Sequence, residues 1–197
     1  ISGSAHRYES YEENDVDAFI YELSKELIKK DYKIISGFGK GIGSSVINGS
    51  LAGINEYRDR DIKSNLILRP FPQNIVDLSK RKYMFTKYRE DMLSEAGVAI
   101  FMFGNKLSQK ESTIVEADGV LEEYSIAKKR GVKVIALGCT GGAAKKIWEE
   151  QMAECETYFP SASYPGLKRL YEKLGEKDVS LEECKKLVLE ILDTVSG

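Results

Sequence analysis

A loop of alternating glycines carries the clearest ligand-binding chemistry in this sequence. It directly follows the apolar segment "KIIS" (33–36) and contains Gly37, Gly39, Gly41 and Gly43. Glycine lets backbone N–H groups approach an anion closely, and the start of a following helix favours negative charge. Ile42 interrupts the dinucleotide-binding fingerprint, and a glycine after Lys40 interrupts the Walker A motif. We therefore predict a phosphate or ribose-phosphate site, and a turn that is glycine-rich only for close packing is the alternative.

An arginine in line with apolar residues is the second candidate. Phe85, Arg89 and Leu93 are four residues apart within a long helical pattern, so they share one helix face. In one arrangement the stem of Arg89 packs while its guanidinium reaches solvent, which is the commoner case. In the other, the guanidinium points into a cleft and binds an anion through two hydrogen bonds. The sequence leaves both arrangements open.

Two adjacent carboxylates are the third candidate. Gly119 is placed to begin a helix, and Glu122 and Glu123 follow soon after it. Acids near a helix start interact favourably with the helix dipole, and this role needs no ligand. A carboxylate at the edge of a cleft would instead accept hydrogen bonds from ribose hydroxyls. The choice between the two glutamates stays open, because a shift of one residue in the helix start changes the face.

The elements that must position these groups alternate along the chain. A strand is expected to end within "ISGSAH", helical patterns follow each strand, and further strands are predicted at 32–36, 65–71, 98–104 and 132–138. The third of these runs is apolar throughout, which marks a central parallel strand covered on both faces. We therefore predict an α/β fold in one domain, residues 1–197, with a Rossmann-like, doubly wound parallel sheet and helices on both faces.

Three loops should form the ligand-binding edge of this sheet, because ligands bind beyond the carboxyl ends of the strands in such folds. These loops are "SGSAHRY" (2–8), "GFGKGIG" (37–43) and "GNKLSQKESTIVEADG" (104–119). The chain then ends in extra helices. Ser180 and Glu183 form a capping-box pattern, and apolar residues recur at helical spacing from Leu181 to Val195. We expect this stripe to be core, although a surface that pairs with a second copy has the same pattern.

Composition narrows the functional classes. The 197 residues are 42% hydrophobic and 30% charged with a net charge of −2, which suits a globular domain and argues against nonspecific binding of nucleic acid. The three cysteines, Cys139, Cys155 and Cys184, and the single His6 are far apart, so we expect neither a disulfide framework nor a metal site. No apolar stretch has the length of a membrane span, and we expect a cytoplasmic protein. The first residue is Ile, and we take the chain to be a module of a longer protein.

In their order along the chain, these motifs resemble the LOG superfamily of Rossmann-like nucleotide phosphoribohydrolases. In that family an Arg-Lys-x-x-Met helix precedes an apolar strand, and Pro-Gly-Gly-x-Gly-Thr-x-x-Glu follows it. The segments "KYREDMLSEAGVAIFMFG" (87–104) and "ADGVLEEYSIA" (117–127) take these places. By position, Arg89 matches the motif arginine, Gly119 the glycine before threonine, and Glu123 the motif glutamate. The resemblance covers most of residues 1–140.

Three departures from the hydrolase pattern affect the expected activity. Glu90 replaces the motif lysine, Val120 replaces the threonine, and Phe103 and Gly104 with a long insertion replace the Pro-Gly-Gly entry. One motif carboxylate thus remains in a rebuilt loop. We expect a nucleotide-shaped pocket with no catalytic residues, no metal and no cofactor.

Within the superfamily, the sequence is most similar to the SLOG sensor domain at the C-terminus of the Sir2-type NADase effector of Thoeris antiphage defence. The resemblance implies a regulatory domain that binds a cyclic ADP-ribose isomer made by a partner TIR-domain protein. Binding would activate an N-terminal Sir2-like NADase domain of the same chain within a homo-oligomer. The implied ligand-binding residues are Ser4, Ala5, Gly37, Phe38, Gly39, Gly41, Ile42, Gly43, Arg89, Phe103, Gly104, Lys106, Gly119, Glu122 and Glu123.

The resemblance also implies roles for these residues. Backbone amides and Ser4 would hold the pyrophosphate, Arg89 and Lys106 would add positive charge, and a glutamate would hold ribose hydroxyls. Two other classes stay open. One is an active phosphoribohydrolase that releases a base from a nucleoside monophosphate. The other is a single-strand nucleic-acid binder that uses the basic helix 80–89 with Tyr83 and Tyr88, which the acidic composition disfavours.

Overall fold

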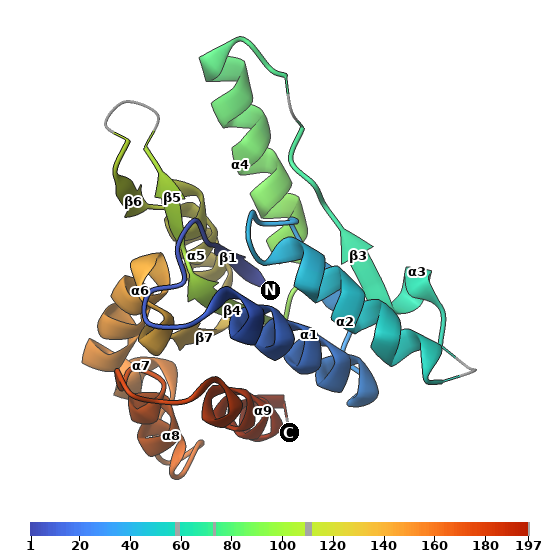
Figure 1. Ribbon diagram of the computed structural model, residues 1–197. Coiled ribbons are helices and arrows are strands. Elements are labelled where there is room, and N and C mark those ends of the chain that lie inside the picture. Colours follow the sequence, from blue (N-terminus) through green and yellow to red (C-terminus); the bar gives the residue numbers. More distant parts are fainter. Residues whose placement is uncertain (58–59, 73, 109–111, 197) are drawn as a thin grey trace.

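A parallel sheet forms the centre of the computed structural model, which describes residues 1–57, 60–72, 74–108 and 112–196 (Figure 1). Strands β1 (Ser2–Ser4), β4 (Val98–Phe103) and β7 (Lys133–Leu137) pair in that order, and β2 (Ile34–Ser36) pairs with β3 (Leu66–Leu68). All of these pairs are parallel. The backbone nitrogen of Ile1 donates to the carbonyl of Ile35 (2.8 Å), which links the two sheets. The predicted strands are confirmed, although 32–36 and 65–71 are shorter than expected.

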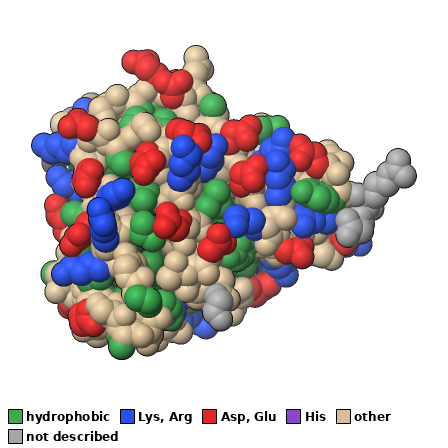
Figure 2. Space-filling model, turned by 90° about the horizontal axis from the view of Figure 1, so that it is seen from below, with side chains coloured by type: hydrophobic (Ala, Val, Ile, Leu, Met, Phe, Trp, Pro, Cys, Tyr) green, Lys and Arg blue, Asp and Glu red, His purple; other side chains and the backbone are tan. Residues whose placement is uncertain are grey.

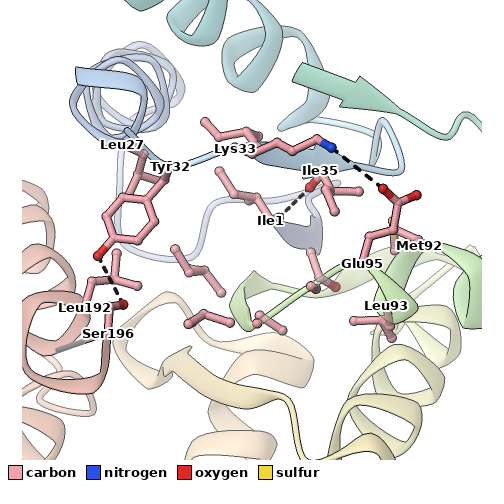
Figure 3. A pocket seen from close by; sticks show the side chains of 17 residues that line it. Ile1, Leu27, Tyr32, Lys33, Ile35, Met92, Leu93, Glu95, Leu192 and Ser196 are labelled. Carbon is pink, nitrogen blue, oxygen red and sulfur yellow. Dashed lines mark hydrogen bonds and ion pairs between the residues drawn. The ribbon is translucent and has the colours of Figure 1, made fainter. Parts of the chain in front are cut away.

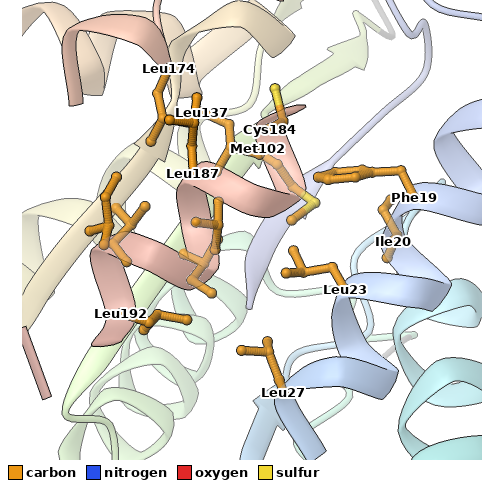
Figure 4. Close-up of a cluster of buried hydrophobic side chains, with 14 of the residues drawn as sticks. Phe19, Ile20, Leu23, Leu27, Met102, Leu137, Leu174, Cys184, Leu187 and Leu192 are labelled. Atoms are coloured by element: carbon orange, nitrogen blue, oxygen red, sulfur yellow. The ribbon is translucent and has the colours of Figure 1, made fainter. Parts of the chain in front are cut away.

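Helices cover both faces of the sheet, as the doubly wound prediction requires. Successive residues of a strand point to opposite faces, so Ile100 and Met102 of β4 join one apolar cluster and Phe101 joins another. The first cluster includes α1 (Glu13–Lys29) and α9 (Leu181–Ser196), as Figure 4 shows. The second includes α5 (Asp118–Arg130) and α6 (Gly142–Ala153). The apolar run of β4 is therefore a buried central strand.

The remaining elements lie around this centre. They are α2 (Gly43–Asn55), α3 (Ile62–Asn65), α4 (Leu78–Ser94), β5 (Asn105–Leu107), β6 (Ile114–Glu116), η1 (Gly138–Thr140), α7 (Cys155–Tyr158) and α8 (Leu167–Lys173). Strands β5 and β6 form an antiparallel hairpin within the loop that follows β4, which the sequence pattern did not predict because each strand is only three residues long. Residues 109–111 of that loop lie outside the described residues. In the described part of the chain, every helix is too short or too polar to cross a lipid bilayer.

The last helix is part of the core. The Glu183 amide donates to the hydroxyl of Ser180 (3.1 Å), so the predicted cap at the start of α9 is confirmed on the serine side. The apolar stripe is buried and packs against α1 and the sheet, and its buried members are Cys184, Leu187, Val188, Ile191 and Leu192. The core interpretation of this stripe is therefore confirmed.

A tyrosine protects the free edge of β7. This strand pairs with β4 on one side, and Tyr171 of α8 is fully buried on the other. The Tyr171 hydroxyl accepts a hydrogen bond from the Ala136 amide (3.0 Å) and donates to Oε1 of Gln151 (2.9 Å). An unpaired amide at a sheet edge invites pairing with another chain, and burial without a partner costs free energy. Tyr171 thus ends the sheet at β7.

We predict that Tyr171→Phe lowers the free energy of unfolding by about 1–3 kcal/mol, because the buried Ala136 amide loses its acceptor. Tyr32→Phe is the matched control, since its hydroxyl donates to Ser196 at an exposed site (3.1 Å). The control should change stability by less than about 0.5 kcal/mol. Urea unfolding followed by circular dichroism measures both. Equal stability losses in the two variants would contradict the role given to Tyr171.

Candidate functional site

The loops at the carboxyl ends of the strands are tied together by backbone hydrogen bonds. The Gly104 amide donates to the carbonyl of Ser4 at the end of β1 (2.8 Å). The Gly104 carbonyl accepts from Ala117 (2.8 Å), just before α5, and from Ala143 (3.1 Å), in the first turn of α6. One residue after β4 therefore fixes the end of β1 and the starts of two helices. The predicted residues Ser4 and Gly104 are brought together.

The glycine loop packs directly on the chain that leaves β1. A Cβ atom at Gly39 would overlap the carbonyl oxygen of Gly3, and one at Gly41, where φ is +80°, would overlap that of Ala5. The Ala5 amide also donates to the carbonyl of Lys40 (2.8 Å). These contacts support the close-packing alternative for two of the four glycines. They also hold Ala5 against the loop, as the predicted site requires.

Part of the loop keeps donors for an anion. Among the residues that the structure describes, the amides of Gly39, Lys40 and Gly41 have no hydrogen-bond acceptor, whereas those of Ile42 and Gly43 donate to the Gly39 carbonyl (3.2 and 2.8 Å). These donors precede the first turn of α2, where the helix dipole favours an anion. Close packing and anion binding are therefore compatible in the same loop.

The side chains around these donors differ in exposure. The Ile42 side chain is buried in the hydrophobic core, so it anchors the loop to the core and does not face a ligand. Phe38 is 49% exposed and has a φ of +58°. Gly37 and Gly43 are the first and last glycines of the loop. A Cβ atom at Gly43 would lie 2.8 Å from the Phe38 ring, so a glycine here leaves room for that ring. Phe38 is thus the predicted loop residue with a large side chain on the surface.

Arg89 of α4 is held by carboxylates of the chain itself. Its Nη1 donates to Oε2 of Glu122 (2.9 Å), and its Nε lies 3.5 Å from Oε1 of Glu123, at ion-pair distance rather than in a hydrogen bond. The guanidinium also lies over the ring of Phe71, 4.8 Å from its centroid. Only 9% of Arg89 is exposed. Neither arrangement expected from the sequence describes this residue: the guanidinium is buried, and its partners are two glutamates.

Both candidate glutamates face Arg89, so the structure brings them together without choosing one. Helix α5 begins at Asp118, which places both glutamates beyond the first turn. Glu123 is buried and accepts a hydrogen bond from the Ser2 hydroxyl (2.5 Å), while half-buried Glu122 accepts one from Thr86 of α4. Burial raises the pKa of Glu123, and the Ser2 hydrogen bond and the Arg89 charge oppose this rise. These contacts join β1, α4 and α5.

Gly119 and Lys106 line the same region from α5 and the hairpin. A Cβ at Gly119 would overlap Nη2 of Arg89, so this glycine leaves room for the guanidinium. Lys106 of β5 is 45% exposed at its side chain and is paired with Asp118. The hydrogen bond from Lys106 lowers the pKa of the Asp118 carboxyl. Lys106 is therefore the predicted cation that solvent can reach, whereas Arg89 is enclosed.

Phe103 takes a supporting position. Its side chain is fully buried, and its ring meets that of Tyr8 edge to face at 5.6 Å. Its amide donates to the Thr140 hydroxyl (2.7 Å). A direct side-chain contact with a ligand is not available in this conformation, so Phe103 shapes the site through the backbone, where φ is +55°.

Sequence reasoning missed Asn105, which shapes the first loop. This residue is 3% exposed, its Oδ1 accepts from the amides of His6 (2.8 Å) and Arg7 (3.1 Å), and its Nδ2 donates to the Arg7 carbonyl (2.8 Å). The Ser4 hydroxyl donates to the Asn105 carbonyl (3.2 Å). A polar residue directly after the apolar run of β4 was the available signal. Ser2 and Thr86, which hold the two glutamates, carried no such signal.

Two hollows differ in their fit to a nucleotide. One of about 510 Å³ opens at the carboxyl edge, where polar side chains of the first loop meet Lys40 and Gly41. The other, of about 250 Å³, lies at the amino ends of the strands between Ile1, Ile34 and Val98 (Figure 3). Its wall is mainly aliphatic, and the pair Lys33–Glu95 (3.8 Å) lies among its lining residues. Phosphates need donors and positive charge, so the chemistry favours the carboxyl edge.

Comparison with known proteins gives a consistent picture. The model of the Sir2- and TIR-associating SLOG family matches residues 1–195. The chain is 39% identical to the NAD(+) hydrolase ThsA of Bacillus cereus (strain MSX-D12) over its whole length, which is 40% of that protein. It is 39% identical to ThsA of Cytobacillus dafuensis and 35% identical to ThsA of Acinetobacter baumannii (strain 532279), covering 98% and 99% of this chain and 38% and 40% of those proteins. The chain thus spans about two fifths of the curated relatives it matches.

We predict that Glu123 makes folding less favourable as pH rises. Its folded-state pKa is raised above the usual 4.5, so in the window above that value the folded state keeps a proton that the unfolded state has released. Stability should therefore fall with rising pH there, by up to about 1.4 kcal/mol per pH unit, until the folded-state pKa is passed.

The matched variants are Glu123→Gln and Glu122→Gln. Urea unfolding at a series of pH values gives the difference in stability between each variant and the parent protein. The difference for Glu123→Gln should change with pH across this window, because the variant lacks the titrating group. Glu122→Gln keeps the Glu123 carboxyl, so the titration of Glu123 should largely cancel when this variant is compared with the parent protein. A flat difference curve for Glu123→Gln would refute the assignment.

Proposed function

This chain belongs to the Sir2- and TIR-associating SLOG family, and we propose that it is the regulatory sensor domain of an NAD-hydrolysing antiphage protein of the Thoeris type. In this proposal the domain binds a cyclic ADP-ribose isomer made by a partner TIR-domain protein. The bound form activates a Sir2-like NADase domain in the same chain, within a homo-oligomer in the cytoplasm. Relatives named NAD(+) hydrolase that extend beyond the matched region support an attached effector domain.

The main support for a nucleotide ligand is the arrangement of groups around β1. Gly3 touches the glycine loop at Gly39, and Ser2 donates to Glu123. The loop amides and the glutamates therefore lie on either side of one three-residue strand. Amides at a helix start suit a pyrophosphate, and carboxylates suit ribose hydroxyls. A nucleotide with both groups could use the two sides together.

Arg89 has a positioning role in this proposal. It is bound by two glutamates, so the cluster carries one positive charge and two carboxylates. A phosphate would compete poorly with carboxylates that are already in place. The arginine instead orients Glu122 and Glu123 to accept hydroxyl groups. Lys106, paired with Asp118 at the surface, supplies the charge that a phosphate can reach.

The domain acts by binding rather than by catalysis. Val120 is buried and has no hydroxyl where the hydrolase motif has threonine, and Glu90 replaces the motif lysine. A cyclic ligand loses little freedom on binding, so a noncatalytic site can reach useful affinity. Activation then requires that the ligand bind one arrangement of the domains more tightly than the other.

A phosphoribohydrolase is the second candidate, because Arg89 and Glu123 lie in contact as the motif pair of that family would. The nucleic-acid alternative has less support. Arg89 is enclosed, and Tyr88 packs beside Phe71 with 6.1 Å between ring centroids, which leaves Tyr83 as the exposed one of the two tyrosines on α4. Figure 2 views the molecule from the side away from α4, and on that face basic side chains are interspersed with acidic ones, so it offers no basic patch as a substitute.

Calorimetric titration tests the sensor function. We expect one cyclic ADP-ribose isomer to bind more tightly than NAD, ADP-ribose and AMP, and to be recovered unchanged. Lys106→Ala should weaken this binding by about 10- to 100-fold through loss of a charge-assisted hydrogen bond. Lys146→Ala is the matched control, because Lys146 is an exposed lysine paired with Glu116 of the same hairpin at 3.2 Å. The control should bind with unchanged affinity.

The other outcomes separate the candidates. Free adenine released from AMP would identify a hydrolase and refute the sensor function. Steeply salt-dependent binding of single-stranded DNA, without cyclic nucleotide binding, would favour the nucleic-acid class. Equal weakening in Lys106→Ala and Lys146→Ala would contradict the place given to Lys106.

A further inference from the structure

Two cysteines that are distant in sequence meet in the fold. The sulfur atoms of Cys139 and Cys184 are 3.2 Å apart, although the residues are 45 positions apart in the chain. Cys139 lies in η1 directly after β7, and Cys184 lies in the first turn of α9, where Figure 4 shows it near Leu174 and Met102. Sequence spacing gave no reason to pair them. Both are free thiols, as is Cys155.

Their surroundings give the two thiols different reactivities. Cys139 is partly exposed, whereas Cys184 is fully buried. The hydrogen bond between the two thiols lowers the pKa of Cys139; burial opposes this, and the Tyr11 hydroxyl and backbone amides add to it. The same hydrogen bond and burial raise the pKa of Cys184. The thiolate is the form of cysteine that reacts readily with oxidants, so Cys139, the more exposed thiol with the lowered pKa, should react first.

We propose that Cys139 and Cys184 form an oxidation site that hydrogen peroxide converts to an intramolecular disulfide. The Cys139 thiolate attacks one peroxide oxygen and breaks the O–O bond, giving a sulfenic acid and a hydroxide that leaves as water. The Cys184 sulfur then attacks the Cys139 sulfur, and the sulfenic oxygen leaves as a second water with the Cys184 proton. Two electrons pass from the two sulfurs to the peroxide, and a dithiol reductant reverses the step.

The bond requires little movement. A disulfide has an S–S length of about 2.05 Å, so the sulfurs must approach by roughly 1.2 Å from their present separation. The backbone at Cys139 is already fixed, because its amide donates to the Leu174 carbonyl (2.7 Å). Cys184 is held by the buried stripe of α9. The reaction thus joins two positions that the folded chain already places together.

The disulfide would fasten α9 to the end of β7. Cys139 is also next to Thr140 in the chain, and the Thr140 hydroxyl accepts a hydrogen bond from the amide of Phe103, one of the candidate site residues. Closing a long loop removes entropy from the unfolded chain, so oxidation should stabilise the fold. This inference rests on the cysteine contact and is independent of the proposed ligand.

Peptide mapping after peroxide treatment tests the proposal on the purified protein. We expect non-reducing digests to contain one peptide pair, linked through Cys139 and Cys184, with a mass lower by two hydrogen atoms. The midpoint of thermal unfolding should rise by roughly 5–10 °C on oxidation and return with dithiothreitol. Cys155→Ser, which removes a buried thiol on α7, should behave like the parent protein.

Further variants and an unfolded control make the result decisive. Cys139→Ser and Cys184→Ser should show neither the linked pair nor the thermal shift. In urea the same treatment should give mixed pairings that include Cys155, which would show that the fold selects the pair. If the folded protein instead yields Cys139 as sulfinic acid or in a disulfide between chains, with Cys184 still a free thiol, the proposal is wrong. Because the mapping uses the unmutated protein, this holds even if a variant does not fold.

Discussion

The close approach of backbone segments at the carboxyl edge is the constraint on which the rest of the structure depends. Gly104 binds the end of β1 through its amide and the starts of α5 and α6 through its carbonyl. On the other side of β1, Gly39 has no room for a side chain against Gly3. Backbone groups that meet this closely must pair with each other or stay free for a ligand, because side chains cannot reach between them. This crowding is why the loops that follow β1, β2 and β4 come together at one edge of the sheet.

The buried charge cluster depends on the same geometry. A buried guanidinium needs compensating charge, and the cost of desolvating ions is recovered only when hydrogen bonds satisfy them. Arg89 meets Glu122 and Glu123, and Ser2 and Thr86 donate to the remaining carboxylate oxygens. The pair Arg89–Glu123, which matches the hydrolase motif, therefore has a structural role: it balances buried charge and holds α4 against α5. The presence of the Arg89–Glu123 pair in this place does not by itself require catalysis.

Sequence reasoning reached the fold because the apolar runs and their order are local signals. It found β4 and β7 from continuous hydrophobicity, and it found the glycine loop from composition. It could not give the orientation of Arg89, because helical spacing fixes a face but not the partner across it. Asn105 and the Cys139–Cys184 contact were missed for a related reason: each depends on segments far apart in the chain. The hairpin β5–β6 was missed because its strands are only three residues long, too short to give a recognisable alternation of apolar and polar residues.

The three residues of β1 connect these parts. Ser2 donates to Glu123, Gly3 contacts the glycine loop, and the Ser4 carbonyl accepts from Gly104. These three residues are consecutive in one extended strand, with a rise of about 3.3 Å per residue, so a shift of one of them displaces its neighbours. If the proposed ligand repositions the glycine loop, β1 is the segment through which the two glutamates would respond, because it contacts both the loop and Glu123.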